Sequence, residues 1–321
     1  MYNPLVSIIS VNYNQAQVTC EMIASLQRVT YPAIEIIIVD NASPTDDPSI
    51  IKQKYPQVNL IRSAANLGFA GGNNLGIAQA KGEYLLFLNN DTEVDPGFIQ
   101  PLVRLFQSNA QAGIASPKII YYGTDNIIQY AGSKGINPWT GRSITLGSLE
   151  KDLGQHNQSA RTELADGAAM MVPRRVIEQV GVMPEIFFLY YEELDWCEMI
   201  KRAGFTCHYV AESTIYHKES ISVGKASVLK TYYMNRNRLL FIKRNTNGLA
   251  FLTSSFIFLT AALPKKTLNF ALHKEWNHLR ALYRGLWWNF QQIGAKNNGN
   301  AGGNQAKIKQ KTASKENALL K

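Results

Sequence analysis

The sequence predicts an α/β fold in which helices flank a mostly parallel central sheet, with a helical extension at the C-terminal end. Short β-branched and aromatic runs alternate with helical patterns over the first 100 residues, which is typical of a parallel sheet. The charge also divides the chain: residues 1–224 hold 16 Lys and Arg against 22 Asp and Glu, whereas residues 225–321 hold 17 against 2. We therefore expect an acidic globular body and a basic segment that faces an anionic partner.

The overall composition is that of a soluble globular protein. The apolar content is 45% and the charged content 18%, which is ordinary for a soluble protein with a sizeable core. Three cysteines, Cys20, Cys197 and Cys207, lack metal-ligand spacing, so we predict free thiols in a reducing compartment. No basic residue precedes the N-terminal apolar run, which favours a strand there over a signal peptide.

The first two strands form a βαβ unit. Residues 6–11 are a β-branched run that stops at Asn12-Tyr13-Asn14, a helical pattern follows, and residues 34–39 form a second buried run that ends at Asp40. This order predicts a parallel sheet. Acidic residues at the ends of such strands accept hydrogen bonds from nucleosides, so Asp40 is a candidate ligand. The alternative is that Asp40 caps a helix.

A glycine-rich segment, residues 66–74, follows a third predicted strand at residues 58–61. Its glycines allow a ligand to approach the backbone closely, and the start of the helix that follows can stabilise an anion. The glycine spacing is neither that of a dinucleotide fingerprint nor that of a Walker loop. The segment therefore argues against an NAD enzyme and against a P-loop ATPase.

The central strand is predicted at residues 85–91, where an apolar run ends abruptly in Asn89-Asn90-Asp91. The carboxyl edge of a parallel sheet is where ligands bind. Asn89 and Asp91 are two residues apart and point the same way, and their oxygens suit Mg²⁺ or Mn²⁺ shared with phosphate. The alternative is an Asn-Asp turn that begins a helix.

The middle of the chain contains one distinctive segment. Residues 111–122 are predicted as a strand, and residues 123–164 as loops and edge strands. From Asp166, small residues lead into an apolar pair, which predicts a strand packed beneath a pocket, with a helix from Val176 onward. Arg174 and Arg175 are candidates for pairing with phosphate, and the alternative is a solvated helix start.

Three carboxylates crowd together after an aromatic run: Glu192, Glu193 and Asp195. Such crowding raises at least one pKa, and separated pKa values are how acid and base roles are assigned. The alternative is an acidic helix surface. The flanking aromatic and apolar residues argue against a wholly solvated face.

Four motifs occur in order at fitting spacings, at residues 11–14, 39–43, 66–70 and 88–91. Together they resemble the nucleotide-sugar half of the inverting family 2 glycosyltransferases, and they are most similar to the bacterial rhamnosyltransferase-like branch. The resemblance implies a GT-A fold, which is Rossmann-like, for a catalytic domain at residues 1–224. Residues 1–100 would bind the nucleotide sugar, and residues 101–224 would bind the acceptor and supply the base.

The resemblance also implies roles for individual residues. Those expected to bind the nucleotide sugar are Asn12, Asn14, Asp40, Asn66, Gly68 and Asn90. Those expected to hold Mg²⁺ or Mn²⁺ on the diphosphate are Asp91, Asn89 and His217. Those expected on the acceptor side are Gly167, Ala168, Glu192 and Trp196. The Asp-x-Asp motif of the family is Asn89-Asn90-Asp91 here, so its first ligand is neutral.

Glu193 falls where the family has its general base, and Asp195 is a second candidate. The base of the family is usually Asp, so the side chain of Glu193 would be longer than that of the usual base. The mechanism that the resemblance implies is direct displacement with inversion, in which a carboxylate deprotonates an acceptor hydroxyl.

The last third of the chain predicts an association with membranes. Residues 249–263 form an uncharged, largely apolar run of 15 residues with basic pairs on both sides. A membrane span needs about 20 residues, so we expect residues 225–290 to form helices that lie in the interface on anionic lipid. Trp276, Trp287 and Trp288 suit that level of the bilayer. Residues 291–321 are rich in Asn, Gly, Gln and Lys, and we predict a disordered tail.

The predicted function is the transfer of one sugar, rhamnose or a similar one, from a UDP- or dTDP-sugar to a saccharide or polyprenyl-diphosphate-linked acceptor in cell-surface polysaccharide synthesis. The expected location is peripheral, at the cytoplasmic face of a bacterial plasma membrane. Gln-x-x-Arg-Trp and a series of membrane spans are absent from the sequence, which favours single addition over processive synthesis. The alternatives are a sugar nucleotidyltransferase and a catalytically idle membrane-associated scaffold. The acidic body argues against a nucleic-acid binder.

Overall fold

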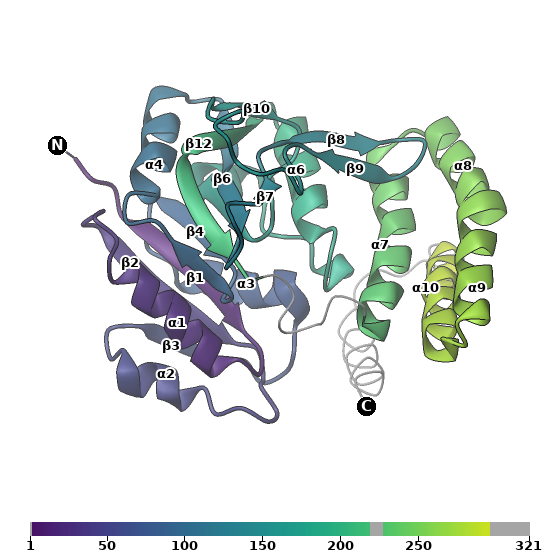
Figure 1. Ribbon diagram of the computed structural model, residues 1–321, viewed down its shortest axis with the longest axis horizontal. Coiled ribbons are helices and arrows are strands. Elements are labelled where there is room, and N and C mark those ends of the chain that lie inside the picture. The colour runs from purple at the N-terminus through teal and green to yellow at the C-terminus, as the bar shows by residue number, and fades with distance from the viewer. Residues whose placement is uncertain (1, 219–226, 296–321) are drawn as a thin grey trace. The chain divides into compact units, whose positions relative to one another are not determined.

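The computed structural model describes residues 2–218 and 227–295 (Figure 1). They divide into two compact units, each of which is described by itself. The first unit comprises Met1–Gly135 and Ser143–Ser222, and the second comprises Ile136–Arg142 and Val223–Lys321. Residues 136–142 thus belong with the C-terminal helices, although the sequence places them in a loop of the catalytic domain.

The first unit contains one large sheet with helices on both faces (Figure 1). The order of its strands is β10-β12-β6-β11-β4-β1-β2-β3, and β5 and β7 pair with β12 and β6. The strands of this sheet are β1 (Val6–Asn12), β2 (Ile34–Asp40), β3 (Asn59–Arg62), β4 (Tyr84–Leu88), β5 (Thr92–Val94), β6 (Ala112–Tyr121), β7 (Ile128–Tyr130), β10 (Ala160–Thr162), β11 (Ala169–Pro173) and β12 (Thr206–His217). Two further strands, β8 (Ser133–Asn137) and β9 (Arg142–Thr145), form a separate hairpin.

The N-terminal half of the sheet is wholly parallel, because β4, β1, β2 and β3 all run the same way. β11 runs antiparallel to β4 and β6, whereas β12 runs parallel to β6 and antiparallel to β5 and β10. The sheet is therefore mixed, and the predicted α/β class is confirmed. The helices of this unit are α1 (Ala16–Leu26), α2 (Ser49–Lys54), α3 (Gly68–Gln79), α4 (Ile99–Ser108), α5 (Arg174–Val180), the short 3₁₀ turn η1 (Glu185–Phe187) and α6 (Glu192–Arg202).

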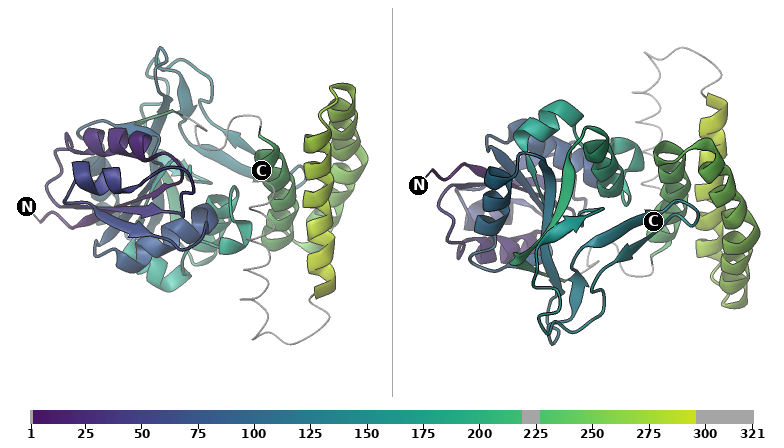
Figure 2. Two further views of the ribbon diagram at one scale, coloured as in Figure 1. Left: turned by 90° about the horizontal axis from the view of Figure 1, so that it is seen from below. Right: turned by 90° about the horizontal axis from the view of Figure 1, so that it is seen from above.

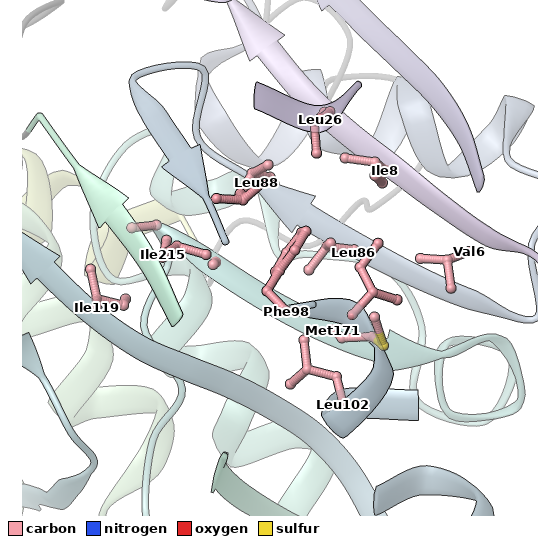
Figure 3. Close-up of a cluster of buried hydrophobic side chains, with 14 of the residues drawn as sticks. Val6, Ile8, Leu26, Leu86, Leu88, Phe98, Leu102, Ile119, Met171 and Ile215 are labelled. Atoms are coloured by element: carbon pink, nitrogen blue, oxygen red, sulfur yellow. The ribbon is translucent and has the colours of Figure 1, made fainter. Parts of the chain in front are cut away.

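The core lies on both faces of β4. On one face, Leu26 of α1 and Phe98, which immediately precedes α4, lie in the same buried cluster as Leu86 (Figure 3). On the other face, the Phe87 ring meets the edge of the Trp196 ring of α6 at a centroid distance of 5.4 Å. All residues of β4 are buried, which explains the uninterrupted apolar run in the sequence.

β4 ends at Leu88, whereas the sequence predicts a strand as far as Asp91. Asn89, Asn90 and Asp91 instead form the turn between β4 and β5. The chain has to leave the direction of β4 there, because β5 pairs with the distant strand β12. The polar turn therefore lies beside the C-terminal end of β12.

The second unit consists mainly of helices (Figure 2). They are α7 (Val228–Asn245), α8 (Gly248–Ile257), the π-helical turn η2 (Phe258–Ala262), α9 (Leu263–Leu272) and α10 (Trp276–Ala295). α7 packs against α10, and the Arg236 guanidinium of α7 stacks on the Trp288 ring at 4.2 Å. Trp288 is therefore partly covered by protein, whereas Trp276 and Trp287 are exposed. Arg238 also donates a hydrogen bond to the Thr140 carbonyl, which attaches residues 136–142 to this unit.

The apolar run of the second unit belongs to a longer helix than the sequence predicts. α8, η2 and α9 form one continuous helix, Gly248–Leu272, of 25 residues. By length and composition it is long enough and apolar enough to cross a bilayer. The apolar run of 15 residues is shorter than a membrane span, but the helix that contains it is not, because it continues through Lys265 and Lys266 to Leu272. α10 also continues past residue 290 to Ala295, and the rest of the predicted tail, residues 296–321, lies outside the described residues.

Candidate active site

Asp40 lies at the carboxyl end of β2, where neighbouring side chains hold its carboxylate. The Asn12 amide donates to Oδ1 at 2.8 Å, and the Ser43 hydroxyl donates to the same oxygen at 2.6 Å. Oδ2 accepts a longer bond of 3.3 Å from the Ser43 backbone amide. Asp40 does not cap α2, whose N-cap is Pro48. A buried carboxylate of fixed orientation at this edge suits hydrogen bonding to a nucleoside.

The same network reaches the turn after β4. Asn12 Oδ1 accepts from the Thr19 hydroxyl at 2.8 Å, and the Asn90 amide donates to that hydroxyl at 3.0 Å. All three side chains are buried. The predicted nucleotide-sugar residues Asn12 and Asn90 therefore join Asp40 in one network. Thr19 completes it, although nothing in the sequence marks this residue of α1.

Asn14 shapes the loop between β1 and α1. Its φ is 56°, a left-handed value that Asn adopts more readily than most residues. Its backbone amide donates to the Ser43 hydroxyl at 2.8 Å, and its side-chain oxygen accepts from the Thr45 amide at 3.1 Å. Asn14 thus orders two loops beside Asp40, and its contact with a nucleotide sugar stays a prediction.

Asn41 holds the glycine-rich segment against the end of β2. Its amide nitrogen donates to the Gly68 carbonyl at 2.9 Å and to Asn66 Oδ1 at 3.1 Å. Its oxygen accepts from the Leu67 backbone amide at 2.9 Å. Gly68 has a φ of +72°, in the region that favours glycine. The predicted ligands Asn66 and Gly68 therefore lie next to the Asp40 network.

The first turns of α3 also hold the segment that leads into α6. The Phe69 backbone amide donates to the Phe188 carbonyl at 2.7 Å. The Asn74 side chain makes two hydrogen bonds with the Met183 backbone, at 3.0 and 3.1 Å. Three bulky residues of this segment have left-handed φ values of 66°, 68° and 77°: Phe188, Tyr190 and Tyr191. Such backbone costs about 1–3 kcal/mol per residue and persists only where neighbours enforce it.

Gly68→Ala is expected to destabilise the protein and to reduce transfer by about tenfold or more. A Cβ at this position would lie 2.1 Å from the Phe188 carbonyl oxygen, so the strained segment would have to move. Thermal denaturation and initial rates measure the effect. Gly123→Ala is the matched control, because Gly123 has a φ of +71° with no atom near its Cβ, and it should show only backbone strain of about 1–2 kcal/mol. Equal losses in the two variants would show that the Phe188 contact is not restrictive.

His217 lies beside Asp91, although the two are 126 residues apart in the chain. The antiparallel pairing of β12 with β5 places His217 opposite Thr92. His217 Nε2 lies 3.1 Å from Asp91 Oδ1 and 3.4 Å from the Asn89 amide nitrogen. Asp91 and His217 are both buried. The structure thus brings together the three residues that the sequence predicts as metal ligands.

The hydrogen bond on the other side of the ring decides which nitrogen of His217 carries the proton. Nδ1 lies 2.9 Å from Gln129 Oε1, and an amide oxygen only accepts, so Nδ1 is the donor. In the neutral ring, Nε2 then turns its lone pair toward the Asp91 carboxylate. Two electron-rich atoms at this distance are stabilised by a cation between them. These side chains therefore fit a divalent metal ion.

The protein would supply only part of such a coordination shell. The described residues contain no group of three or more His, Cys, Asp or Glu side chains that could hold a metal ion. Asp91 and His217 would provide two ligands. Mg²⁺ commonly binds proteins through one or two carboxylates, with phosphates and water completing its shell. The site therefore fits a cation that arrives with a phosphate-bearing ligand.

Glu193 lies in the first turn of α6, against the segment that precedes β11. A Cβ on Gly167 would lie 3.4 Å from Glu193 Cγ. Burial raises the pKa of the Glu193 carboxyl, backbone amides at the start of α6 oppose that shift, and the Asp166 charge adds to it, so that the pKa is about 7. A carboxyl group with this pKa is suited to accept a proton near neutral pH.

The other residues predicted near the base differ from Glu193 in exposure. Glu192 and Asp195 are buried, with exposed fractions of 2% and 0%, whereas Glu193 keeps part of its surface open. Trp196 is fully buried and donates to the Gly181 carbonyl at 3.0 Å. Glu192 and Trp196 thus present little surface to an acceptor, and their contact with one stays a prediction.

Gly167 and Ala168 lie between Glu193 and the turn after β4. The Asn89 backbone amide donates to the Ala168 carbonyl at 2.9 Å, while Gly167 packs on Glu193. Ala168 itself is buried, and the assignment of Gly167 and Ala168 to the acceptor side stays a prediction. The polar turn of β4 and the first turn of α6 thus flank one short segment.

Arg174 and Arg175 anchor α5 to the backbone of neighbouring loops. Arg174 donates to the carbonyls of Ala80 and Gly82 at 2.7 and 2.8 Å. Arg175 donates to the Ala112 carbonyl at 3.1 Å. The Arg174 guanidinium is thus held by backbone carbonyls, whereas Arg175 is exposed beside its contact with Ala112. The pairing of either with phosphate stays a prediction.

Comparison with known proteins places this arrangement in a family. The model of the family described as glycosyl transferase family 2 matches residues 7–181. The low-salt glycan biosynthesis hexosyltransferase Agl10 of Haloferax volcanii is 27% identical over 241 residues, covering 73% of this chain and 74% of that protein. The N-acetylglucosaminyl-diphospho-decaprenol L-rhamnosyltransferase of Mycobacterium tuberculosis is 24% identical over 269 residues, covering 75% and 85%.

Solved structures share the fold at low sequence identity. The mannosyltransferase PcManGT of Pyrobaculum calidifontis, in complex with GDP-Man and Mn²⁺, superposes with a TM-score of 0.57 at 14% identity, covering 100% of this chain and 86% of that chain. S. aureus TarS 1–349 in complex with UDP superposes with a TM-score of 0.54 at 15% identity, covering 87% and 81%. The fold is thus that of the GT-A glycosyltransferases, and the chain belongs to glycosyltransferase family 2.

Proposed function

We propose that this glycosyltransferase transfers one sugar, rhamnose or a similar hexose, from a UDP- or dTDP-sugar to a saccharide or polyprenyl-diphosphate-linked acceptor, with inversion at the anomeric carbon. The proposal rests on one observation: the short segment Gly167-Ala168 contacts Glu193 through Gly167 and the turn that contains Asp91 through Ala168. A base and a diphosphate site on opposite sides of one sugar are what direct displacement requires. The rhamnosyltransferase among the relatives supports the sugar and the lipid-linked acceptor.

In this mechanism Glu193 accepts the proton of the acceptor hydroxyl, whose oxygen attacks the anomeric carbon. The bond to the diphosphate breaks on the opposite face, so the configuration inverts. Asp40 accepts hydrogen bonds from the nucleoside and orients the donor. Asp91 and His217 would hold Mg²⁺ or Mn²⁺, which when bound neutralises the charge on the leaving diphosphate. With a pKa of about 7, Glu193 is ionised in a large fraction of molecules near neutral pH and still accepts a proton readily.

A donor panel tests the proposed reaction. Purified full-length protein is incubated with UDP-, dTDP- and GDP-sugars, Mn²⁺ and a polyprenyl-diphosphate-linked saccharide, and the released nucleotide is identified. We expect nucleoside diphosphate and a product longer by one sugar of inverted configuration. Release of pyrophosphate would indicate a nucleotidyltransferase. No turnover, together with no donor-dependent thermal shift, would indicate an idle scaffold.

We further propose that residues 225–290 attach the enzyme to the cytoplasmic face of a membrane. The helix Gly248–Leu272 buries one row of side chains within its own unit and exposes an apolar row. The exposed row consists of Leu249, Leu252, Phe256 and Leu259. α10 likewise exposes Trp276, Tyr283, Trp287 and Phe290. Exposed apolar rows beside the exposed cations Lys265, Arg280 and Arg284 suit an in-plane position on anionic lipid, where each cation near the surface adds about 1 kcal/mol.

The double substitution Leu252→Glu with Phe256→Glu is expected to lower binding to anionic vesicles by about tenfold or more. Each side chain loses the burial of an apolar group that is worth roughly 1.5–3 kcal/mol. Co-sedimentation of full-length protein measures the effect. The matched control places the same two charges at exposed polar positions, Asn269→Glu with Asn277→Glu, and should lose only the part that salt screens. Identical pelleting of both variants would contradict an apolar contribution.

A further inference from the structure

Gln129 is an unexpected neighbour of the predicted metal ligands. It lies on β7, one strand beyond β6, and its Oε1 accepts a hydrogen bond from His217 Nδ1 at 2.9 Å. The two residues are 88 positions apart in the chain. Gln129 is half-buried, whereas His217 is buried. No motif of the sequence singles out Gln129.

An irregularity of the sheet places the Gln129 side chain. In the pairing of β7 with β6, Tyr130 lies opposite Ile119 and Ile128 lies opposite Ile120. Consecutive residues of β6 thus pair with residues of β7 that are two positions apart. Gln129 is the extra residue between them, so β7 has a β-bulge at this position. Bulges re-aim side chains and occur often beside active sites. The bulge directs Gln129 toward the end of β12.

We propose that Gln129 is a positioning residue that fixes the tautomer and the ring orientation of His217, so that His217 Nε2 and the Asp91 carboxylate together hold a divalent cation. This inference rests on the proposed function, which assigns the cation to Asp91 and His217. A histidine that binds a metal through one nitrogen commonly donates the other N–H to an oxygen acceptor, and removing that acceptor typically costs 10–100-fold in metal affinity.

The geometry distinguishes this role from simple packing. Nε2 lies 3.1 Å from Asp91 Oδ1, so a neutral ring with its proton on Nε2 would donate to Asp91 and block the metal position. In the neutral ring, the bond to Gln129 holds the single proton on Nδ1 and so disfavours that arrangement. Loss of the Gln129 oxygen should therefore weaken cation binding even where the fold is intact.

Three full-length variants test the inference: Gln129→Met, Gln129→Glu and Asp91→Ala. Met has nearly the shape of Gln but lacks the oxygen, whereas Glu keeps an acceptor for Nδ1–H. Mn²⁺ binding in the presence of UDP or dTDP is followed by EPR spectroscopy, and the tautomer of His217 by ¹⁵N NMR, with the resonance assigned from His217→Gln. We expect Gln129→Met to weaken Mn²⁺ binding about 10–100-fold and to lose the Nδ1–H signature, and Gln129→Glu to stay within a few-fold of the unaltered protein.

Each outcome decides between the inference and its premise. If Asp91→Ala abolishes Mn²⁺ binding and Gln129→Met leaves it unchanged, Gln129 has no positioning role. If Asp91→Ala also leaves Mn²⁺ binding unchanged, the metal site itself is misassigned, and the proposed function fails first. Should Gln129→Met melt at a much lower temperature, Gln129→Asn replaces it, because its shorter side chain keeps the polarity but withdraws the oxygen. Unchanged binding in that variant likewise overturns the inference.

Discussion

Asp91→Ala is expected to abolish sugar transfer, with a loss of about 10³-fold or more. The side chain is the charged ligand of the predicted metal position, buried in the turn between β4 and β5 with His217 Nε2 3.1 Å away. Without it, the leaving diphosphate would lose electrostatic stabilisation of the kind that is worth several kcal/mol in a buried site. Initial rates of nucleoside diphosphate release measure the loss, alongside a titration of the unaltered enzyme with EDTA.

Asp125→Ala is the matched control for this substitution. Asp125 is an exposed carboxylate of the same unit that pairs with Lys151, so its removal should leave the rate within about twofold, because exposed ion pairs contribute little. Thermal denaturation of both variants separates loss of fold from loss of chemistry. Activity retained by Asp91→Ala, or unchanged in EDTA, would show that the metal hypothesis is wrong.

Glu193→Gln is expected to lower kcat by about 10²-fold or more while donor affinity stays nearly unchanged. Gln keeps the size of the side chain but cannot accept the proton of the acceptor hydroxyl. Donor binding should persist because the Asp40 network and the glycine-rich segment do not depend on Glu193. Single-turnover rates and calorimetric donor titrations measure the two quantities separately.

Asp195→Asn discriminates between the two candidate bases. Asp195 is fully buried on α6, so its substitution is expected to affect stability more than the chemical step. A crippling effect of Asp195→Asn with a mild effect of Glu193→Gln would move the assignment to Asp195. Loss of activity in both, with equal loss of thermal stability, would indicate a structural role for the whole cluster.

The raised pKa of Glu193 predicts the acid side of the pH profile. Below pH 7 the carboxyl becomes protonated and cannot act as a base, so kcat/KM should fall about tenfold per pH unit below about 7 and level off above it. Burial and the Asp166 charge both raise this pKa. Asp166→Asn removes a negative charge, which favours the ionised form of Glu193, and should move the acid limb to lower pH.

Local patterns in the sequence determine the strands of the first unit and the polar residues at their ends. A strand covered on both faces is largely apolar. β4 therefore appears as an uninterrupted apolar run, whereas β1 and β2 keep Ser7, Ser10 and Glu35 within otherwise apolar runs. Polar residues begin where the chain leaves the core, and for that reason Asp40 and Asp91 are recognisable as candidates from the sequence. The crowded carboxylates at residues 192–195 are recognisable for the same local reason.

The tertiary structure alone decides which of these residues meet. His217 reaches Asp91 because β12 pairs with β5 in a particular register, and Gln129 reaches His217 because of a bulge in β7. Neither contact has a local pattern, since a strand pairs through backbone groups that every residue carries. The contact between Gly68 and Phe188 depends in the same way on how α3 packs against a distant loop.

Burial decides the choices that the sequence leaves open. Glu193 and Asp195 are two positions apart on one helix and so face different sides, and only packing determines that Asp195 is buried while Glu193 stays partly open. In the second unit, the helix extends past its apolar run to Leu272, because lysine favours a helix about as well as apolar residues do. The sequence by itself thus determines the candidate polar residues at the ends of the strands and at the start of α6. Strand register and the buried face of each helix, which depend on long-range packing, decide how those residues are combined.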